Sequence, residues 1–196
     1  MIAIGLTGGV ATGKSTVAKL LHEKGIAIVS SDELAHQAMA PGGPAYDRII
    51  TEFGSKVVLP DGKINRRLLG EIVFKDQAAR KSLEGIVHPI VIRGIREELE
   101  SHSRSGAQIV VVEVPLLFEA GLMDLFDYVW VVSSSYKRQL QRLQERDRLT
   151  KDEAEERIAA QMSLSEKEKR ADAVIKNDDG LDSLEEQLST LLRTLE

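Results

Sequence analysis

The sequence predicts an α/β fold in which a five-stranded parallel sheet is flanked by helices. Short apolar runs alternate along the chain with segments whose apolar residues recur at helical spacing. Such alternation is typical of right-handed βαβ units, which make the strands parallel and place the ligand crevice at their carboxyl ends. The length of 196 residues suits one domain, or one core with a small insertion, so no second core is required.

Five segments have the character of strands. Residues 2–6 form a buried apolar strand, and residues 26–29 form a second one. The run at residues 109–114 is the most strand-like, because it is continuous and β-branched as a central parallel strand should be. Residues 128–132 and 173–175 complete the set. Polar residues that follow these strands are therefore candidates for a site.

Helical patterns fill the intervals between the strands. Val17, Leu20 and Leu21 mark the core face of the first helix, which Gly25 is expected to stop. Ser30 and Glu33 fit a capping box that opens the next helix. The final helix repeats leucine on one face and is predicted to pack on the core, through Leu181, Leu184, Leu188, Leu191, Leu192 and Leu195.

A long helical region separates the second and third strands. Residues 41–44 break the preceding helix, and residues 45–101 are mostly helical apart from a turn at residues 59–62. Only residues 56–59 have any strand character. Pro89 is expected in the first turn of a helix that presents an apolar face after it. We interpret this region as a helical insertion into the core.

The segment at residues 136–169 is highly charged and carries only a thin apolar stripe. Leu140 and Leu143 lie on one predicted helix, and Ala154, Ile158 and Met162 lie on a second. Such a stripe predicts two helices that pack weakly on the rest of the chain.

The segment between the first strand and the first helix fits the pattern Gly-x4-Gly-Lys-[Ser/Thr] in the context that this motif requires. Glycines let backbone N–H groups turn inward around phosphate oxygens, and the helix N-terminus adds about half a positive charge. Lys14 reaches the outer phosphates, and Ser15 can ligate Mg²⁺. The pattern predicts a P-loop NTPase fold that binds a nucleoside triphosphate through Gly9, Val10, Ala11, Thr12, Gly13, Lys14, Ser15 and Thr16.

Three carboxylates follow or end the predicted strands. Asp32 lies two serines after the second strand, where it could accept a proton from an acceptor hydroxyl or could simply be an acid favoured by the helix dipole. Glu113 lies where a Walker-B-like acid could reach Mg²⁺, or it could be a buried structural partner. Glu119 is better suited to capping or pairing in the loop that contains it.

Cations are concentrated in the charged segment. Arg138, Arg142 and Arg146 recur every four residues, so one helix face presents three guanidinium groups that suit phosphate charge. The alternative is a solvated face paired with acids, and a phosphate loop in the same chain favours the first interpretation. His88, directly before Pro89, is interpreted from the residues alone as a cap or packing residue.

Composition excludes several classes of protein. The net charge of −5 argues against broad binding to nucleic acid, and the absence of cysteine excludes disulfides and thiolate metal sites. No apolar run reaches the length of a membrane span, and the N-terminus has no leader pattern. We therefore expect a cytoplasmic protein with no nucleic-acid or membrane partner.

Several further motifs occur in an order that resembles the dephospho-CoA kinase family over nearly the whole chain. The histidine–proline pair and the Pro-Leu-Leu-Phe-Glu run are far more specific than the phosphate loop. The elements are Gly5-Leu6-Thr7-Gly8-Gly9 with Gly13 to Thr16, Ser31-Asp32-Glu33-Leu34-Ala35, His88-Pro89, Val114 to Glu119, Gln139, Arg142-Leu143, Arg146-Asp147, Gln161, Ala171-Asp172, Ile175 and Asn177.

The resemblance implies ATP-dependent phosphorylation of the ribose 3′-hydroxyl of dephospho-CoA, the final step of coenzyme A synthesis. It implies a core at about residues 1–32, 107–135 and 170–196, a helical acceptor-binding region at about 33–106 and a lid at about 136–169. ATP and dephospho-CoA would be the substrates and Mg²⁺ the metal, and we expect a monomer or a weak homo-oligomer.

Site residues follow from the resemblance by position. Lys14 and the loop amides would hold phosphates, and Asp32 would be the base. Arg142 and Arg146 would close on the transferred phosphoryl group, and Asn177 would lie near adenine. His88, Leu116 and Glu119 would lie on the acceptor side.

Two departures from the family pattern concern the nucleotide site. The chain has Ala11-Thr12 where the family usually has glycine-serine, which is harmless only if φ is negative there. The stretch from Asn177 to Gly180 is one residue longer than usual, which leaves the adenine contact open.

Two other classes of protein share the phosphate loop and are the alternatives. A nucleoside, shikimate or gluconate kinase would share the loop and the lid, but the His88-Pro89 pair and the Pro115–Glu119 run argue against it. A GTP-dependent switch normally carries Asp-x-x-Gly and Asn-Lys-x-Asp, and the sequence contains neither.

Overall fold

A computed structural model describes residues 1–195 of the chain. The chain forms two compact units, one built from Met1–Val29 and the chain from Ser101 onward, the other from Ser30–Glu100.

The sheet has five strands in the order β2-β3-β1-β4-β5. The strands are β1 (Ile2–Gly8), β2 (Ala27–Ser30), β3 (Ile109–Glu113), β4 (Tyr128–Ser133) and β5 (Ala173–Lys176). β1 pairs in parallel with β3 and β4, and β4 pairs in parallel with β5. The predicted α/β fold with a parallel sheet is confirmed. Each strand differs from its predicted range by at most two residues at either end.

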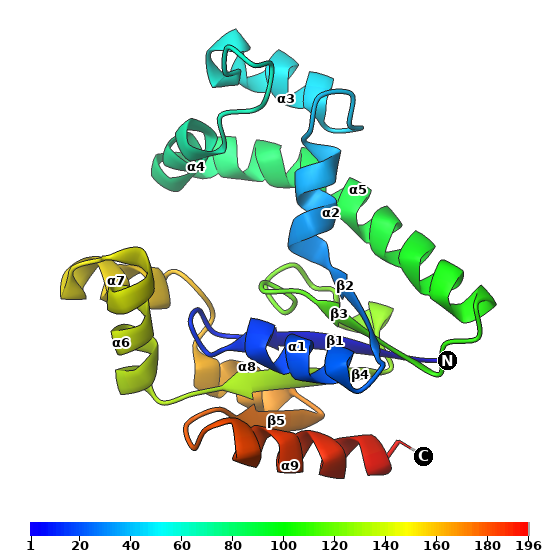
Figure 1. Cartoon of the computed structure of the whole chain (residues 1–196). Helices are drawn as coiled ribbons and strands as arrows, with labels where there is room; N and C mark the ends of the chain where they lie inside the picture. Colours follow the sequence, from blue (N-terminus) through cyan, green and yellow to red (C-terminus); the bar gives the residue numbers. More distant parts are fainter. Residues whose placement is uncertain (196) are drawn as a thin grey trace. The chain divides into compact units, whose positions relative to one another are not determined.

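Two helices pack on the sheet, and together with it they form the main apolar core. α1 (Lys14–Glu23) contacts β1 and β3, and α9 (Leu181–Arg193) contacts both β5 and α1 (Figure 1). Leu21, Trp130 and Leu188 are buried together in this core. The leucine face of the last helix therefore packs as predicted.

The charged segment contains three helices where two were predicted. They are α6 (Tyr136–Asp147), α7 (Lys151–Ala159) and α8 (Leu164–Arg170). Thr150 forms a reciprocal capping box at the start of α7, and the Ser163 hydroxyl accepts from the Glu166 N–H at the start of α8. Each hydroxyl accepts a hydrogen bond from a backbone N–H in the first turn of the helix that follows, and so marks a new helix start. Met162 therefore lies outside α7, in the connection before α8.

The second unit is helical. It contains α2 (Ser31–Ala38), α3 (Tyr46–Phe53), α4 (Arg66–Lys75) and most of α5 (Gln77–Arg104). The Ser30 hydroxyl accepts from the Glu33 N–H, so the predicted N-cap is present. Residues 56–59 are not a strand, because Ser55–Val57 form a 3₁₀ turn and Val58 makes only a single bridge to Ile64.

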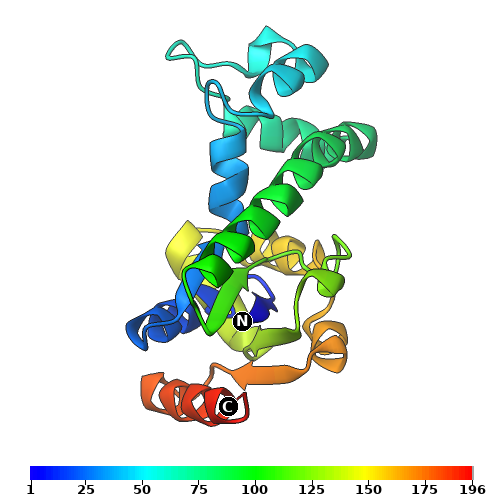
Figure 2. The ribbon, with the colours of Figure 1, turned by 90° about the vertical axis from the view of Figure 1, so that its right-hand side faces the viewer.

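Pro89 lies inside α5 rather than in its first turn, which corrects the sequence-based expectation. The helix is a single element from Gln77 to Arg104, and Figure 2 shows it as one long ribbon. Proline removes one backbone hydrogen bond to the residue four before it. Val87 and Val91 are buried on either side of Pro89, so packing holds one helix across the lost bond.

Within residues 1–195, no helix has both the length and the apolar character needed to cross a membrane.

Candidate active site

The glycine-rich loop lies at the carboxyl edge of the parallel sheet. β1 ends at Gly8, and α1 begins at Lys14. Gly8 is in register with Val132 of β4, and Leu6 is in register with Glu113 of β3. The strand, loop and helix therefore follow one another as an anion-binding loop requires.

Two glycines of the loop are required by close approaches. A Cβ on Gly13, which has φ of 93°, would lie 2.1 Å from the Asn177 amide nitrogen. A Cβ on Gly8 would lie 2.3 Å from the Val132 carbonyl oxygen. No side chain fits at either distance, so the backbone of the loop can lie directly against β4 and the end of β5.

Ala11 occupies the left-handed region with φ of 58°. This is the position where the family usually has glycine, so the departure noted from the sequence carries a cost. A Cβ in the left-handed region costs roughly 1–2 kcal/mol, which is partly offset because alanine has less freedom than glycine in the unfolded chain.

We expect Ala11→Gly to raise the free energy of unfolding by about 0.5–1 kcal/mol, because it removes this strain. Thermal denaturation followed by circular dichroism measures the change, expected as an increase of a few degrees for a chain of this size. Ala159→Gly in α7, where the backbone is helical, is the matched control and should destabilise. A lower melting temperature for Ala11→Gly would contradict the strain argument.

A cavity of about 500 Å³ opens on the loop and is called the loop cavity here. Three cationic side chains, two hydroxyl-bearing residues and one carboxylate contribute to its wall. The Lys14 ammonium lies 3.2 Å from the Gly9 carbonyl oxygen and 3.4 Å from that of Gly8. The structure brings together seven predicted site residues in its lining, and Glu145, which was not predicted, lies with them. The predicted ones are Ala11, Gly13, Lys14, Ser15, Thr16, Arg142 and Arg146.

Arg142 binds the backbone carbonyl groups of the phosphate loop. Its guanidinium donates to the carbonyl oxygens of Ala11 at 3.2 Å and Thr12 at 3.1 Å, and to that of Asn177 at 3.0 Å. The Asn177 side-chain amide, itself buried, donates to the same Thr12 carbonyl at 2.8 Å. Arg142 and Asn177 thus brace the backbone of the phosphate loop from behind.

Arg146 is more exposed and points from the same helix. It makes a two-point contact with Asp147, with nitrogen–oxygen distances of 2.8 and 3.0 Å. These hydrogen bonds hold the pKa of the Asp147 carboxyl below its ordinary value. Arg138, the third arginine of the face, donates to the Asp178 carbonyl oxygen at 3.1 Å. The face therefore contributes two guanidinium groups, not three, to the loop cavity.

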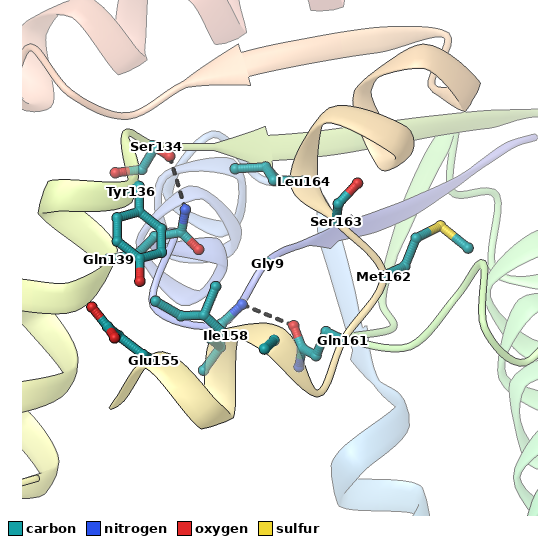
Figure 3. Close-up of a pocket in the computed structure, with 12 residues that line it drawn as sticks. Gly9, Ser134, Tyr136, Gln139, Glu155, Ile158, Gln161, Met162, Ser163 and Leu164 are labelled. Carbon is teal, nitrogen blue, oxygen red and sulfur yellow. Dashed lines mark hydrogen bonds between the residues drawn. The ribbon is translucent and has the colours of Figure 1, made fainter. Parts of the chain in front are cut away.

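A second cavity of about 540 Å³ lies between the loop and helices α6 to α8, and we call it the lid cavity (Figure 3). The Gln161 side-chain oxygen accepts from the Val10 N–H at 3.0 Å. Gln139 donates to the Ser134 carbonyl oxygen at 3.0 Å. The Tyr136 ring points toward Glu155, and partial burial together with this carboxylate raises the pKa of the tyrosine.

Glu119 is engaged within the protein. Its carboxylate lies 2.8 Å from the ammonium of Lys167, a completely buried lysine, and accepts from the Met162 N–H at 3.0 Å. Lys167 also donates to the Pro115 carbonyl oxygen at 3.2 Å. This is the pairing alternative that the sequence left open for Glu119. Its role on the acceptor side stays a prediction.

The remaining predicted residues lie in other places. Asp32 is exposed in the first turn of α2, and His88 is half-buried in the middle of α5, so both belong to the second unit. Leu116 is 44% exposed on the loop after β3. Glu113 is the last residue of β3, the strand directly beside β1, and β1 leads into the phosphate loop. Within residues 1–195 no group of three or more histidine and acidic residues could hold a metal ion.

Residue reasoning missed the contacts of Gln161 and Lys167. Their partners lie 151 residues away at Val10 and 48 residues away at Glu119. Only the resemblance singled out Gln161, and no spacing or composition signal in the chain distinguishes Lys167 from the neighbouring solvated lysines.

The sheet order and the strand–loop–helix site define a kinase of the P-loop class. The fold is shared with shikimate kinase from Acinetobacter baumannii, with a TM-score of 0.54 at 17% identity over 100% of this chain and 93% of that one. A family model described as dephospho-CoA kinase matches residues 2–183, and the chain belongs to this family.

Individual relatives are similar to this chain over almost its whole length. The dephospho-CoA kinase of Bacillus licheniformis is 49% identical over 193 residues, covering 98% of this chain and 96% of the relative. That of Carboxydothermus hydrogenoformans is 44% identical, covering 97% and 92%. Among solved structures, TT1252 from Thermus thermophilus has a TM-score of 0.85 at 37% identity, covering 100% and 98%. Dephospho-CoA kinase from Campylobacter jejuni has a TM-score of 0.74 at 29% identity, covering 98% and 96%.

The chain is therefore an enzyme with dephospho-CoA kinase activity, which is the final step of coenzyme A biosynthesis. A kinase of this family uses ATP, in agreement with the nucleoside triphosphate predicted from the loop.

Proposed function

We propose that the enzyme transfers the terminal phosphoryl group of ATP to the ribose 3′-hydroxyl of dephospho-CoA, with the triphosphate in the loop cavity. The observation that carries the proposal is the wall of this cavity, where Lys14, Arg142 and Arg146 meet the backbone of the phosphate loop. Phosphoryl transfer requires mainly positioning and stabilisation of negative charge, and these groups supply both.

Lys14 is the residue that acts on the charge of the transferred group. It is the first residue of α1, so its backbone N–H lies at the positive end of the helix dipole. Its ammonium rests on two loop carbonyls, from which a phosphate oxygen could draw it because an oxyanion is the stronger acceptor.

Ser15 and the phosphates would hold Mg²⁺. The Ser15 hydroxyl lines the loop cavity and offers the hard oxygen ligand that Mg²⁺ prefers, and such sites use few protein ligands. Glu113, at the carboxyl end of β3, is the proposed second contact, made through water. When bound, the ion would neutralise charge on the phosphate oxygens.

Asp32 is the proposed base for the acceptor hydroxyl. It is exposed at the start of α2, directly after β2, and the ordered strand and the Ser30 cap fix its backbone. On the acceptor side we propose His88, Leu116 and Glu119, and near the adenine ring we propose Asn177, whose amide group holds the loop at Thr12. We further propose that the enzyme acts in the cytoplasm as a monomer or weak homo-oligomer.

Arg142→Lys and Arg146→Lys should each lower turnover by roughly 10-fold to 10³-fold, because lysine keeps the charge but lacks the planar fork. The two variants should differ in stability. Arg142→Lys should lower the melting temperature by a few degrees, since its contacts with two loop carbonyls and with the Asn177 carbonyl depend on its geometry. Arg146→Lys should leave it nearly unchanged, because Arg146 is itself 63% exposed and pairs with its sequence neighbour Asp147. Steady-state kinetics and thermal denaturation measure both.

Hydrogen exchange tests the lid assignment of residues 136–169 in the same proteins. Exchange across α6 and α7 should slow when both substrates are bound, because closure protects backbone amides that a weakly packed segment leaves open. Full activity in both arginine variants, or exchange that is already slow in the free enzyme, would mean that the segment is a static surface.

Mass spectrometry of a reaction with ATP, Mg²⁺ and dephospho-CoA tests the proposed reaction. We expect one added phosphoryl group, located on the ribose 3′ oxygen by fragmentation. Shikimate and gluconate serve as alternative acceptors and should stay unmodified. Phosphorylation at any other position of dephospho-CoA would overturn the proposed regiochemistry.

A further inference from the structure

Gln161 lies in the connection between α7 and α8, directly beside the phosphate loop (Figure 3). Its side-chain oxygen accepts from the Val10 N–H at 3.0 Å. This contact joins the lid segment to the loop that binds phosphate, over 151 residues of sequence.

The connection that carries Gln161 is fixed from the other side. The neighbouring Met162 N–H donates to Glu119, and Lys167 in α8 binds the same carboxylate. Lys167 is completely buried and Glu119 is partly exposed, and because removing one partner would leave the buried ammonium unpaired, the ion pair holds α8 and the loop after β3 together. Gln161 is therefore a positioned group rather than a mobile surface side chain.

The orientation of the Gln161 amide follows from its partner. Val10 offers an N–H, and only the oxygen of a carboxamide can accept it, so the nitrogen must occupy the other position. Two N–H donors then remain on that nitrogen. Across residues 1–195 the structure records no acceptor for them.

This nitrogen lies in the lid cavity, beside the start of the phosphate loop. Gln161 lines the lid cavity together with Gly9 and Val10, where the phosphate loop begins. The lining contains no lysine or arginine and one carboxylate, that of Glu155, and the nitrogen of Gln139, the other carboxamide there, is already used on the Ser134 carbonyl. Gln161 is therefore the carboxamide in this lining whose nitrogen has both hydrogens available.

We propose that Gln161 binds the terminal phosphoryl group of ATP: its oxygen holds the Val10 N–H, and its nitrogen donates to a phosphoryl oxygen. The inference rests on the proposed placement of the triphosphate in the loop cavity, and it requires the terminal phosphoryl group to extend past Gly9 and Val10 toward the lid cavity, whose lining contains Gln161. It assigns to the lid a neutral donor that distinguishes ATP from ADP, in addition to the arginines of α6. A hydrogen bond to a charged oxygen contributes enough for roughly a 10-fold change in affinity.

Two variants separate this role from a purely structural one. Gln161→Glu keeps the oxygen that accepts from Val10 but has no donor, whereas Gln161→Met keeps the length and loses both functions. Gln144→Glu is the matched control, because Gln144 is exposed on α6 and the substitution makes the same charge change in the lid.

Isothermal titration calorimetry with Mg²⁺ and either ADP or a non-hydrolysable ATP analogue gives the readout. Both Gln161 variants should bind the analogue about 10-fold more weakly or worse, with ADP affinity changed less than about 3-fold. Gln144→Glu should bind both ligands like the unaltered enzyme. Melting temperatures check that each variant is folded.

Three results would overturn the inference: an equal loss of affinity for both ligands, a gain of affinity for both, or a Gln161→Glu variant with the same affinities as the unaltered enzyme. Each would leave Gln161 with only its contact with Val10. These outcomes are distinct from failure of the proposed reaction, which would show as no 3′ phosphorylation of dephospho-CoA by the unaltered enzyme.

Discussion

Replacing Lys14 with alanine is expected to abolish turnover, to roughly one thousandth of normal activity or less, while the protein stays folded. The ammonium acts on negative charge that is concentrated in the transition state, where such contacts contribute several kcal/mol. In the free enzyme it donates two long hydrogen bonds to loop carbonyls, and it is not among the buried core residues. Its removal should therefore change the melting temperature little.

Single-turnover kinetics with ATP and dephospho-CoA measure this effect. Lys19→Ala is the matched control, because Lys19 lies on the same helix and is 75% exposed beside Glu23. It should retain full activity. Near-normal turnover in a folded Lys14→Ala protein would refute the assignment of the loop as the phosphate site.

Replacing Asp32 with asparagine should lower turnover by about 10²-fold or more and leave ATP affinity within a few-fold. Asparagine keeps the size of the side chain but cannot take a proton from the acceptor hydroxyl. The competing explanation is that Asp32 only interacts with the dipole of α2, which stabilises by roughly 0.3–1 kcal/mol. That role would show in thermal stability and leave turnover intact.

Glu33→Gln separates the two explanations, because Glu33 lies in the same first turn and is also exposed. Both substitutions remove one negative charge at the helix start, so both should lower the melting temperature by a similar small amount. Only Asp32→Asn should lower turnover, measured under saturating ATP and acceptor. A similar loss of activity in Glu33→Gln would indicate an effect of helix charge rather than a base.

Much of the fold could be predicted because the residue patterns that indicate it lie within single helices and strands. The continuous β-branched run of β3 and the leucine face of α9 each lie within one element, where periodicity reports burial directly. The errors have local causes too. Pro89 has the signature of a helix start, but buried residues on both sides of it keep α5 continuous. Thr150 and Ser163 begin separate helices within a segment whose apolar stripe was too thin to locate them.

The candidate site was readable only in part. The spacing of the phosphate loop identified Lys14 and Ser15, because the motif places every group on one short segment. The helical period placed Arg142 and Arg146 on one face, and both line the loop cavity. The period could not show that Arg142 braces loop carbonyls while Arg146 pairs with Asp147, since the first depends on how α6 meets a loop 130 residues earlier in the chain.

The sequence by itself determined that this protein has a parallel α/β core, a phosphate-loop motif and the motifs of its family, because each is written in adjacent or regularly spaced residues. Only the tertiary structure decided that Ala11 adopts a left-handed conformation, that Glu119 pairs with a buried lysine, and that Gln161 reaches Val10. Backbone conformation in a packed loop and contacts between distant segments depend on the closure of the whole chain, and no pattern of neighbouring residues encodes them.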